Sequence, residues 1–347
     1  MNAERIVRSA CGTRFTAAVL RVERRGELVY ERAFGYVDDA PGSLAATVTT
    51  RFDLASLTKV FVAAAALFAV QDGALALDAP LAFLVPEWRE AAQAAITLRM
   101  LLAHTAGFHS GADYRTLFAE NVERFALLRP PAAAPGERVI YSDLGFIALG
   151  VVLGRALGRG LPAVLASACA RLGAEATAYR PAERERAEIP ATECDAWRGR
   201  VRGTVHDEKA HLMNGIAGHA GLFGSARDVA LLADAFLAPA AGRGARALRP
   251  ATAAEAVREW GADPVLRRGL GWALKTSDAN SCGAVMSRAT FGHTGFTGTC
   301  VWADPERDLS VVFLTNAVYF GRNDLRDVRA AVCDAVAAEF EPCAPSV

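Results

Sequence analysis

Ser56 and Lys59 stand three residues apart in the segment S-L-T-K, where a helix is expected to begin. Because three residues are just under one helical turn, the two side chains lie on one face and can touch. A serine hydroxyl becomes a good nucleophile only when a base takes its proton, and a desolvated lysine can be that base. The spacing therefore indicates a nucleophile and its base. The alternative is an N-capping serine beside a solvated lysine.

An uninterrupted apolar run follows this pair and predicts a helix that is buried on all sides. The run covers residues 60–70 and is rich in alanine, and Gly73 and the Asp78-Ala79-Pro80 segment end it. A serine at the start of such a helix lies near unpaired backbone N–H groups and the positive end of the helix dipole. Both features stabilise the negative charge of an oxyanion intermediate.

Tyr141, Ser142 and Asp143 form a second polar cluster, between a proline-bearing loop and a helix expected from residue 144. A phenol can act as a base or a proton shuttle when a nearby ammonium lowers its pKa. The alternative is a tyrosine that packs through its ring, with Ser142 or Asp143 capping the helix.

A third cluster, G-H-T-G-F-T-G-T at residues 292–299, lies between two expected strands and contains His293, Thr294, Gly295 and Phe296. Backbone N–H groups at a strand edge can complete an oxyanion hole, and glycine lets a substrate approach the backbone closely. The alternative for this segment is a plain turn.

The elements that must position these clusters follow the order strand, helix, strand. Helices are expected at residues 1–10, 60–70, 98–103, 144–157, 161–172, 226–237 and 326–340, and strands at 16–22, 28–36, 269–274, 284–291, 299–303 and 309–315. Because both ends of the chain supply strands around a helical middle, we expect a single α/β unit over residues 1–347. Its sheet-containing region is residues 1–78 plus 205–347, and its mostly helical region is residues 79–204.

Composition excludes some classes of partner. The 347 residues are 52% hydrophobic and 22% charged, and the net charge is zero, which gives no argument for nucleic acid or an anionic membrane. No window reaches the roughly 18 apolar residues of a membrane span. The first ten residues lack the features of a secretory signal, and seven scattered cysteines without a CxxC motif fit a reducing compartment. We therefore expect a cytoplasmic protein, or a periplasmic one if a signal precedes this sequence.

Taken together, the three clusters resemble the active-site elements of the class C β-lactamase-like serine hydrolases, which include penicillin-binding DD-peptidases and family VIII esterases. Three further segments resemble the same family: L-L-A-H-T-A-G-F at 101–108, A-G-L-F-G-S at 220–225 and the terminal hairpin at 298–316. The likeness extends from about residue 15 to residue 335. It implies the DD-peptidase/β-lactamase-like α+β fold, with an antiparallel sheet flanked by helices and a mostly helical subdomain inserted.

The resemblance also implies roles for single residues. Ser56 is the expected nucleophile that forms an acyl-enzyme, and either Lys59 or Tyr141 is the base in acylation. Tyr141 then relays the proton to the leaving group and activates water. The backbone N–H groups of Ser56 and Phe296 are the expected oxyanion hole. The remaining expected substrate-binding residues are His293, Thr294, Gly295 and Asp143. The family needs no metal or organic cofactor, so none is expected here.

Two residues depart from the β-lactamase pattern. His293 stands where β-lactamases and DD-peptidases usually carry a lysine, and a histidine of ordinary pKa is mostly neutral at pH 7. Asp143 stands where an asparagine is usual, and an ionised carboxylate cannot donate a hydrogen bond to a substrate carbonyl. Both changes favour hydrolysis of small esters or related acyl compounds. The alternatives are a DD-carboxypeptidase or β-lactamase acting on amides or lactams, and a catalytically silent ligand-binding or sensor protein. The oligomeric state is left open.

Two other segments have ordinary interpretations. The His206-Asp207-Glu208 segment is rich in metal-ligand types, yet neither His206 with His211 nor His104 with His109 has the i, i+4 spacing of a helical metal site. We therefore expect a structured loop near the cleft. Lys275, in K-T-S, lacks the glycine of the third motif and is expected at a solvated strand end.

Overall fold

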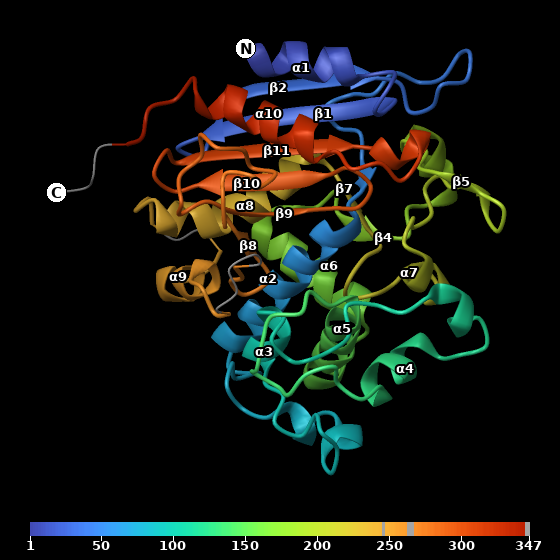
Figure 1. Cartoon of the computed structure of the whole chain (residues 1–347), viewed down its shortest axis with the longest axis vertical. Coiled ribbons are helices and arrows are strands. Elements are labelled where there is room, and N and C mark those ends of the chain that lie inside the picture. Colours follow the sequence, from blue (N-terminus) through green and yellow to red (C-terminus); the bar gives the residue numbers. More distant parts are fainter. Residues whose placement is uncertain (245–246, 262–266, 344–347) are drawn as a thin grey trace.

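The computed structural model describes residues 1–244, 247–261 and 267–343, and within them the main feature is a six-stranded antiparallel sheet (Figure 1). The strand order is β2-β1-β11-β10-β9-β8. Its strands are β1 (Ala17–Arg24), β2 (Glu27–Gly35), β8 (Ala273–Leu274), β9 (Phe291–Thr294), β10 (Cys300–Asp304) and β11 (Leu309–Thr315). The first and last thirds of the chain therefore meet in one sheet, through the pairing of β1 with β11.

Helices cover both faces of this sheet, and the alternation of side chains along β1 explains how. Ala18 and Leu20 belong to the apolar cluster under α1 (Asn2–Ala10) and α10 (Arg326–Ala337). Ala17 and Val19 point the other way and join the larger core, which includes α2 (Thr58–Gln71) and α8 (Ala226–Ala240). Figure 1 shows α1 and α10 on one side of the sheet and α8 on the other.

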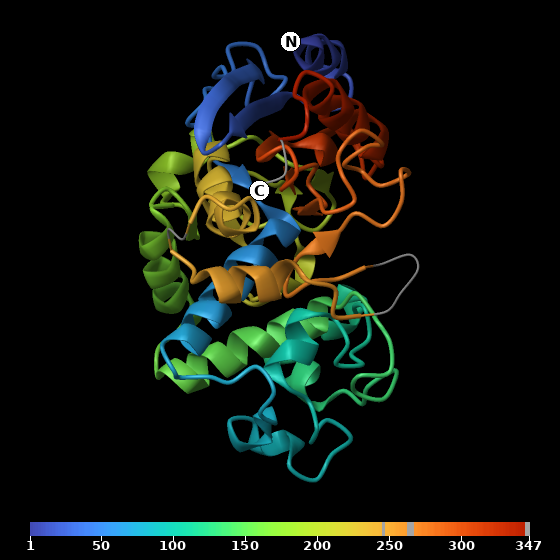
Figure 2. The same ribbon diagram turned by 90° about the vertical axis from the view of Figure 1, so that its left-hand side faces the viewer.

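A mostly helical region lies beyond α2, farthest from the sheet in Figure 2. Its helices are α3 (Leu98–Leu102), α4 (Val122–Leu128), α5 (Asp143–Leu157) and α6 (Leu161–Leu172). The shorter elements around it are α7 (Glu208–Leu212), α9 (Pro250–Val257), β3 (Phe52–Asp53), β4 (Ala178–Tyr179), β5 (Cys194–Asp195), β6 (Gly199–Arg200) and β7 (Leu222–Gly224). Residues 79–204 thus also contain β4, β5 and β6, and β4 pairs with β7 outside that range.

The fold class and most of the expected elements are confirmed. Helix α2 is buried on all sides, as its unbroken apolar run predicts. The strand expected at 284–291 is wrong, because β9 begins only at Phe291. The backbone carbonyls of Ala284 and Met286 accept hydrogen bonds from the Lys275 ammonium instead of from a neighbouring strand. Lys275 is therefore buried, which also corrects its expected solvated position.

Among the described residues, no single helix has both the length and the apolar character needed to cross a membrane. Helices α5 and α6 are long and apolar enough for a membrane span only when they are taken together, and the two helices are bent by 85° relative to each other.

Candidate active site

Ser56 lies in the short 3-10 turn η1 (Ala55–Leu57), which leads directly into α2. Ala55 has a φ of 45°, in the left-handed region that a residue with a side chain rarely adopts. The carboxylate of Asp53 supports this backbone by accepting a hydrogen bond from the Ala55 N–H at 2.8 Å. The sharp turn lets the Ser56 hydroxyl reach the Nζ of Lys59, 2.9 Å away. The expected nucleophile and ammonium therefore touch.

Lys59 is completely buried, and its ammonium contacts polar atoms from three segments of the chain. These are Ser56 Oγ at 2.9 Å, Asp143 Oδ1 at 2.9 Å and the backbone carbonyl of His219 at 3.1 Å. Burial acts to lower the pKa of Lys59, but the neighbouring Asp143 and Tyr141 side chains outweigh burial and leave this pKa above its usual value. In the resting site Lys59 is therefore an ammonium that donates to Ser56.

Tyr141 lies near two cations and near Ser56, the expected nucleophile. The Lys59 Nζ is 4.9 Å from the centre of the Tyr141 ring, and the guanidinium carbon of Arg268 is 5.0 Å from the same point. Tyr141 and Ser56 line the same cavity. Two neighbouring cations stabilise the negative charge that remains on a phenol oxygen when its proton leaves. Because Lys59 already carries a proton, this arrangement favours Tyr141 as the group that accepts the proton of Ser56.

His104 holds Tyr141 in place by contacts with the residues immediately before and after it. Its backbone carbonyl accepts from the N–H of Ile140 at 2.8 Å, and its Nδ1 accepts from the N–H of Ser142 at 3.0 Å. Its ring packs on the Tyr141 ring with a centroid distance of 4.6 Å. Burial and neighbouring cations hold the pKa of His104 well below its usual value, so the ring stays neutral and can accept. The sequence placed His104 in a family-like segment without a role.

The third cluster is fastened to the segment that precedes Ser56. Thr297 Oγ1 donates to the backbone carbonyl of Asp53 at 2.9 Å, and Thr299 Oγ1 donates to that of Leu54 at 3.2 Å. A Cβ at Gly295 would lie 2.8 Å from the Leu54 carbonyl oxygen, so only glycine fits there. In the part of the chain that the structure describes, no acceptor takes the backbone N–H of Ser56 or Phe296. Both groups are available for an oxyanion.

His293 lies beside Tyr141, with 5.9 Å between the ring centres, and it is buried. Its Nδ1 is 2.9 Å from the carbonyl oxygen of Thr294, which can only accept, so Nδ1 carries the proton. Burial, Arg268 and Lys59 lower the pKa of His293 to about 3. The ring is therefore neutral at pH 7, and its Nε2 presents a lone pair. The structure thus supports the expectation that this position supplies no fixed positive charge.

The sequence placed Asp143 among the expected substrate-binding residues, and in the structure its carboxylate contacts two lysines. Its Oδ1 contacts Lys59 at 2.9 Å, and its Oδ2 contacts the Nζ of Lys209 at 3.3 Å. Asp143 begins α5, and Ser142 caps that helix by accepting from the N–H of Gly145 at 3.0 Å. This cap directs Asp143 toward α2, so both of its oxygens are taken by lysines. It does not line the cavity at Ser56.

A cavity of about 630 Å³ opens over the nucleophile. The expected residues that line it are Ser56, Tyr141, His293, Thr294, Gly295 and Phe296. Its charged lining is mostly arginine: Arg267, Arg268, Arg322, Arg326 and Arg329, against the single carboxylate Asp324 among the described residues. Arg329 is buried and donates to the carbonyl of Gly295 at 2.7 Å, so it also supports the oxyanion loop. Sequence analysis missed these arginines, because they come from separate segments without a shared spacing.

Comparison with known proteins agrees with this geometry. A family model described as Beta-lactamase matches residues 4–334. A protein of Escherichia coli (strain K12) named "Putative D-alanyl-D-alanine carboxypeptidase" is 29% identical in an alignment of 343 positions that covers 86% of this chain and 77% of that protein. EstCE1, described as a hydrolase with promiscuous acyltransferase activity, has a TM-score of 0.77 at 23% identity, with 95% of this chain and 97% of that chain covered.

A class C beta-lactamase from Rhodobacter sphaeroides has the same fold, with a TM-score of 0.77 at 19% identity and coverage of 97% of this chain and 99% of that chain. At these identities the solved structures establish the fold, and the family model, which spans nearly the whole chain, establishes the relationship. The protein therefore belongs to the beta-lactamase family and is a serine hydrolase of that fold.

Proposed function

We propose that this protein hydrolyses small esters or related acyl compounds through an acyl-enzyme on Ser56. The observation that carries the proposal is the contact of 2.9 Å between Ser56 Oγ and the fully buried ammonium of Lys59. Burying an ammonium group costs folding free energy, so the stability of the fold does not explain a buried, charged lysine beside a serine at a cavity wall. Such an arrangement is typical of an activated nucleophile.

The reaction follows from the positions of the groups. In the reactive form Tyr141 is a phenolate, whose charge the Lys59 ammonium stabilises; it takes the proton of Ser56 while Oγ attacks the substrate carbonyl, and it becomes a neutral phenol. The N–H groups of Ser56 and Phe296 donate to the oxyanion. Tyr141 then gives its proton to the departing alkoxide, and the ester C–O bond breaks. In the second half, the Tyr141 phenolate takes a proton from water, and the oxygen of that water attacks the acyl carbon. Tyr141 then returns the proton to Ser56 Oγ as the bond between Oγ and the acyl carbon breaks, which releases the acid and restores free Ser56.

Two observations favour esters over peptides and lactams. His293 is neutral, so the third element offers no fixed cation to a substrate carboxylate. Asp143 is bound by Lys59 and Lys209, so it offers no donor to an acylamino side chain. The likeness in fold to EstCE1, a hydrolase by its description, is compatible with this substrate class.

A DD-carboxypeptidase is the second candidate, because arginines dominate the charged lining of the cavity. Arg326 is exposed, and its contact with Asp324 is long, at 3.6 Å, so its guanidinium remains accessible to a substrate carboxylate. The relatives named "Putative D-alanyl-D-alanine carboxypeptidase" point to the same class. In either case the partner is a small molecule, and the reaction needs no cofactor.

The test is intact-protein mass spectrometry after incubation with a fluorophosphonate, beside a Ser56→Ala control, followed by turnover assays. We expect one adduct on the wild-type protein and none on the control. Turnover of p-nitrophenyl acetate without turnover of a peptide ending in D-Ala-D-Ala supports the esterase, and the reverse supports the carboxypeptidase. A penicillin adduct also favours the second candidate. No adduct from either reagent contradicts the acyl-enzyme proposal and favours a silent binding protein.

We also propose that the protein acts in a reducing compartment such as the cytoplasm. All seven cysteines are free thiols. Cys169, Cys282, Cys300 and Cys333 are buried, where a thiol behaves as a small apolar side chain. Cell fractionation followed by immunodetection tests the location, and recovery in the periplasm contradicts it.

A further inference from the structure

A second buried lysine lies behind the active site. Lys209, in α7, contacts Asp143 Oδ2 at 3.3 Å and Asp207 Oδ2 at 3.3 Å. The chain has only three lysines, Lys59, Lys209 and Lys275, against 38 lysines and arginines together. All three lysines are buried, whereas arginine supplies the cations of the surface. Lysine therefore occurs in this protein at positions where a compact ammonium group is buried, and position 209 is one of them.

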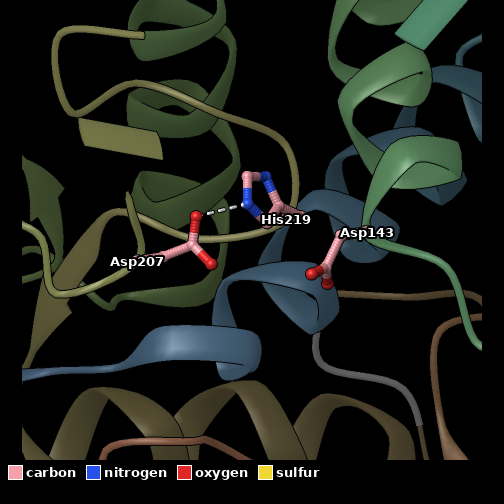
Figure 3. Close-up of side chains that lie close together, drawn as sticks. All are labelled: Asp143, Asp207 and His219. Atoms are coloured by element: carbon pink, nitrogen blue, oxygen red, sulfur yellow. Dashed lines mark hydrogen bonds and ion pairs between the residues drawn. The ribbon is translucent and has the colours of Figure 1, made fainter. Parts of the chain in front are cut away.

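Asp207 and His219 hold Lys209 in position. Asp207 Oδ1 accepts from the N–H of Ala210 at 2.8 Å and so caps α7, which carries Lys209. The same oxygen is 2.8 Å from His219 Nε2, and Figure 3 shows this pair beside the carboxylate of Asp143. His219 also accepts from Lys59 through its backbone carbonyl, at 3.1 Å. One chain of contacts therefore joins the imidazole and Asp207 to both lysines.

We propose that Lys209, fixed by Asp207 and His219, is a positioning residue for the reaction at Ser56, because it occupies Asp143 Oδ2 and leaves only Oδ1 for Lys59. The inference rests on the acyl-enzyme function proposed above. With Oδ2 held by Lys209, the Asp143 carboxylate cannot rotate to bind Lys59 through both oxygens. Lys59 is then free to keep its short contact with Ser56 Oγ.

The charges in this cluster balance, which explains how it can be buried. Lys59 and Lys209 carry two positive charges, and Asp143 and Asp207 carry two negative ones. The lysines hold the pKa of Asp143 below its usual value, and the hydrogen bond with His219 and the charge of Lys209 hold that of Asp207 well below it, each against the opposing effect of burial. Both carboxylates therefore remain ionised, and the network needs no further ion.

A metal ion is the competing interpretation. Asp143, Asp207 and His219 offer ligand atoms that all lie within 4.8 Å of one another (Figure 3). Two ammonium groups already occupy the carboxylates, however, and the His219 Nε2 is bonded to Asp207. A divalent cation would have to displace lysine ammonium groups that are held in the protein interior. The ion pairs with Lys59 and Lys209 account for both oxygens of Asp143 and for Oδ2 of Asp207.

Lys209 also affects the proton equilibrium of Lys59 through space. The charged and titratable groups that face Lys59 from the surrounding elements are Asp143, Tyr141, His219, His293, His104, Arg268 and Lys209. Removing the positive charge of Lys209 removes its repulsion of the Lys59 ammonium and strengthens the net attraction between Asp143 and Lys59, which raises the pKa of Lys59. The proton of the Ser56–Lys59–Tyr141 group is then held more tightly, so the rising limb of a pH–rate profile moves to higher pH, by about one unit.

The experiment compares Lys209→Met with Lys209→Arg, with Lys275→Met as a matched control for loss of a buried lysine outside the network. We measure the rate of fluorophosphonate labelling at Ser56, kcat and KM for p-nitrophenyl acetate from pH 5 to 10, and folding by circular dichroism. We expect labelling and kcat to fall about 10- to 100-fold in Lys209→Met, as for a lost positioning contact. KM changes little, the rising limb moves up, and Lys209→Arg recovers part of the loss. Lys275→Met keeps the wild-type limb.

Different outcomes identify which proposal fails. Wild-type protein that does not label removes the acyl-enzyme function and the inference with it. Wild-type protein that labels, beside a folded Lys209→Met that labels equally fast with an unchanged limb, overturns the inference alone. If Lys209→Met does not fold, Asp207→Asn is used, with the same expected direction and the same refuting result. Activity that EDTA abolishes and zinc chloride restores overturns the inference in favour of a metal site.

Discussion

Asp143→Asn removes the charge that keeps Lys59 protonated while it preserves the shape of the side chain. At the 2.9 Å separation of the pair, the Coulomb attraction is about 6 kcal/mol for an effective dielectric constant of about 20. Relaxation reduces this value, and breaking one partner of a buried pair typically costs about 3–5 kcal/mol. We therefore expect the variant to be less stable than wild type by about 3 kcal/mol at pH 6. At this pH Lys59 is protonated in the unfolded chain, and in the folded variant it must either stay charged without the Asp143 carboxylate or lose its proton; both cost free energy.

The pH dependence of this loss follows from linkage. In wild type the pKa of Lys59 is raised, so its contribution to stability is complete below the unfolded pKa of about 10.4 and is lost only as pH rises through the folded value. In the variant the largest effect that opposes burial is gone, so we expect the folded pKa of Lys59 to fall below the unfolded one. Between these two values the variant gains about 1.4 kcal/mol per pH unit. The stability difference from wild type therefore shrinks as pH rises.

Urea unfolding of wild type and Asp143→Asn at pH 6, 7.5 and 9 measures this difference directly. Asp78→Asn is the control, because Asp78 forms an exposed pair with Arg99, and its loss has no reason to depend on pH in this range. The rising limb of the pH–rate profile should also move to lower pH in Asp143→Asn. A stability difference that stays constant from pH 6 to 9, with an unmoved limb, would refute the inference that the charge of Asp143 keeps Lys59 protonated.

Three further predictions test the rest of the site. His104→Ala removes the ring that packs on Tyr141, so kcat should fall about 10- to 100-fold in steady-state assays at little cost in KM; an unchanged kcat contradicts the role of His104. Gly295→Ala puts a Cβ 2.8 Å from the Leu54 carbonyl oxygen, and the displaced oxyanion loop should lower kcat about 100-fold in a protein that still folds by circular dichroism. Arg326→Gln should lower kcat/KM about fivefold for a carboxylate-bearing ester and leave p-nitrophenyl acetate unaffected, as for an exposed ion pair; equal effects on both substrates exclude a carboxylate contact at Arg326.

Sequence patterns predicted the parts of the molecule that depend on local spacing. The contact of Ser56 with Lys59 follows from helical geometry, and the buried α2 follows from its unbroken apolar run. Family likeness then placed Tyr141 and His293 at the same site, and the structure does bring both to the cavity wall. These inferences needed no knowledge of how distant segments pack.

The remaining features depend on packing between distant segments. The family resemblance placed Asp143 among the expected substrate-binding residues, and it could not indicate the contact of the second Asp143 oxygen with Lys209, which is 66 positions away. The strand expected at 284–291 failed for the same reason, since the group that binds its carbonyls is the side chain of Lys275. The rarity of lysine in an arginine-rich chain is the one signal that could have indicated Lys209 from the sequence.

Asp143 and Lys209 are best understood as one feature. A carboxylate at position 143 introduces a negative charge next to Lys59, where the family usually has a neutral amide. Alone, this charge would fasten the ammonium to Asp143 and compete with its contact to Ser56. Lys209 takes half of that interaction, and Asp207 balances the charge that Lys209 adds. On the inference proposed here, the departure at Asp143 changes how Ser56 is activated, and its effect on substrate choice is the loss of an amide donor.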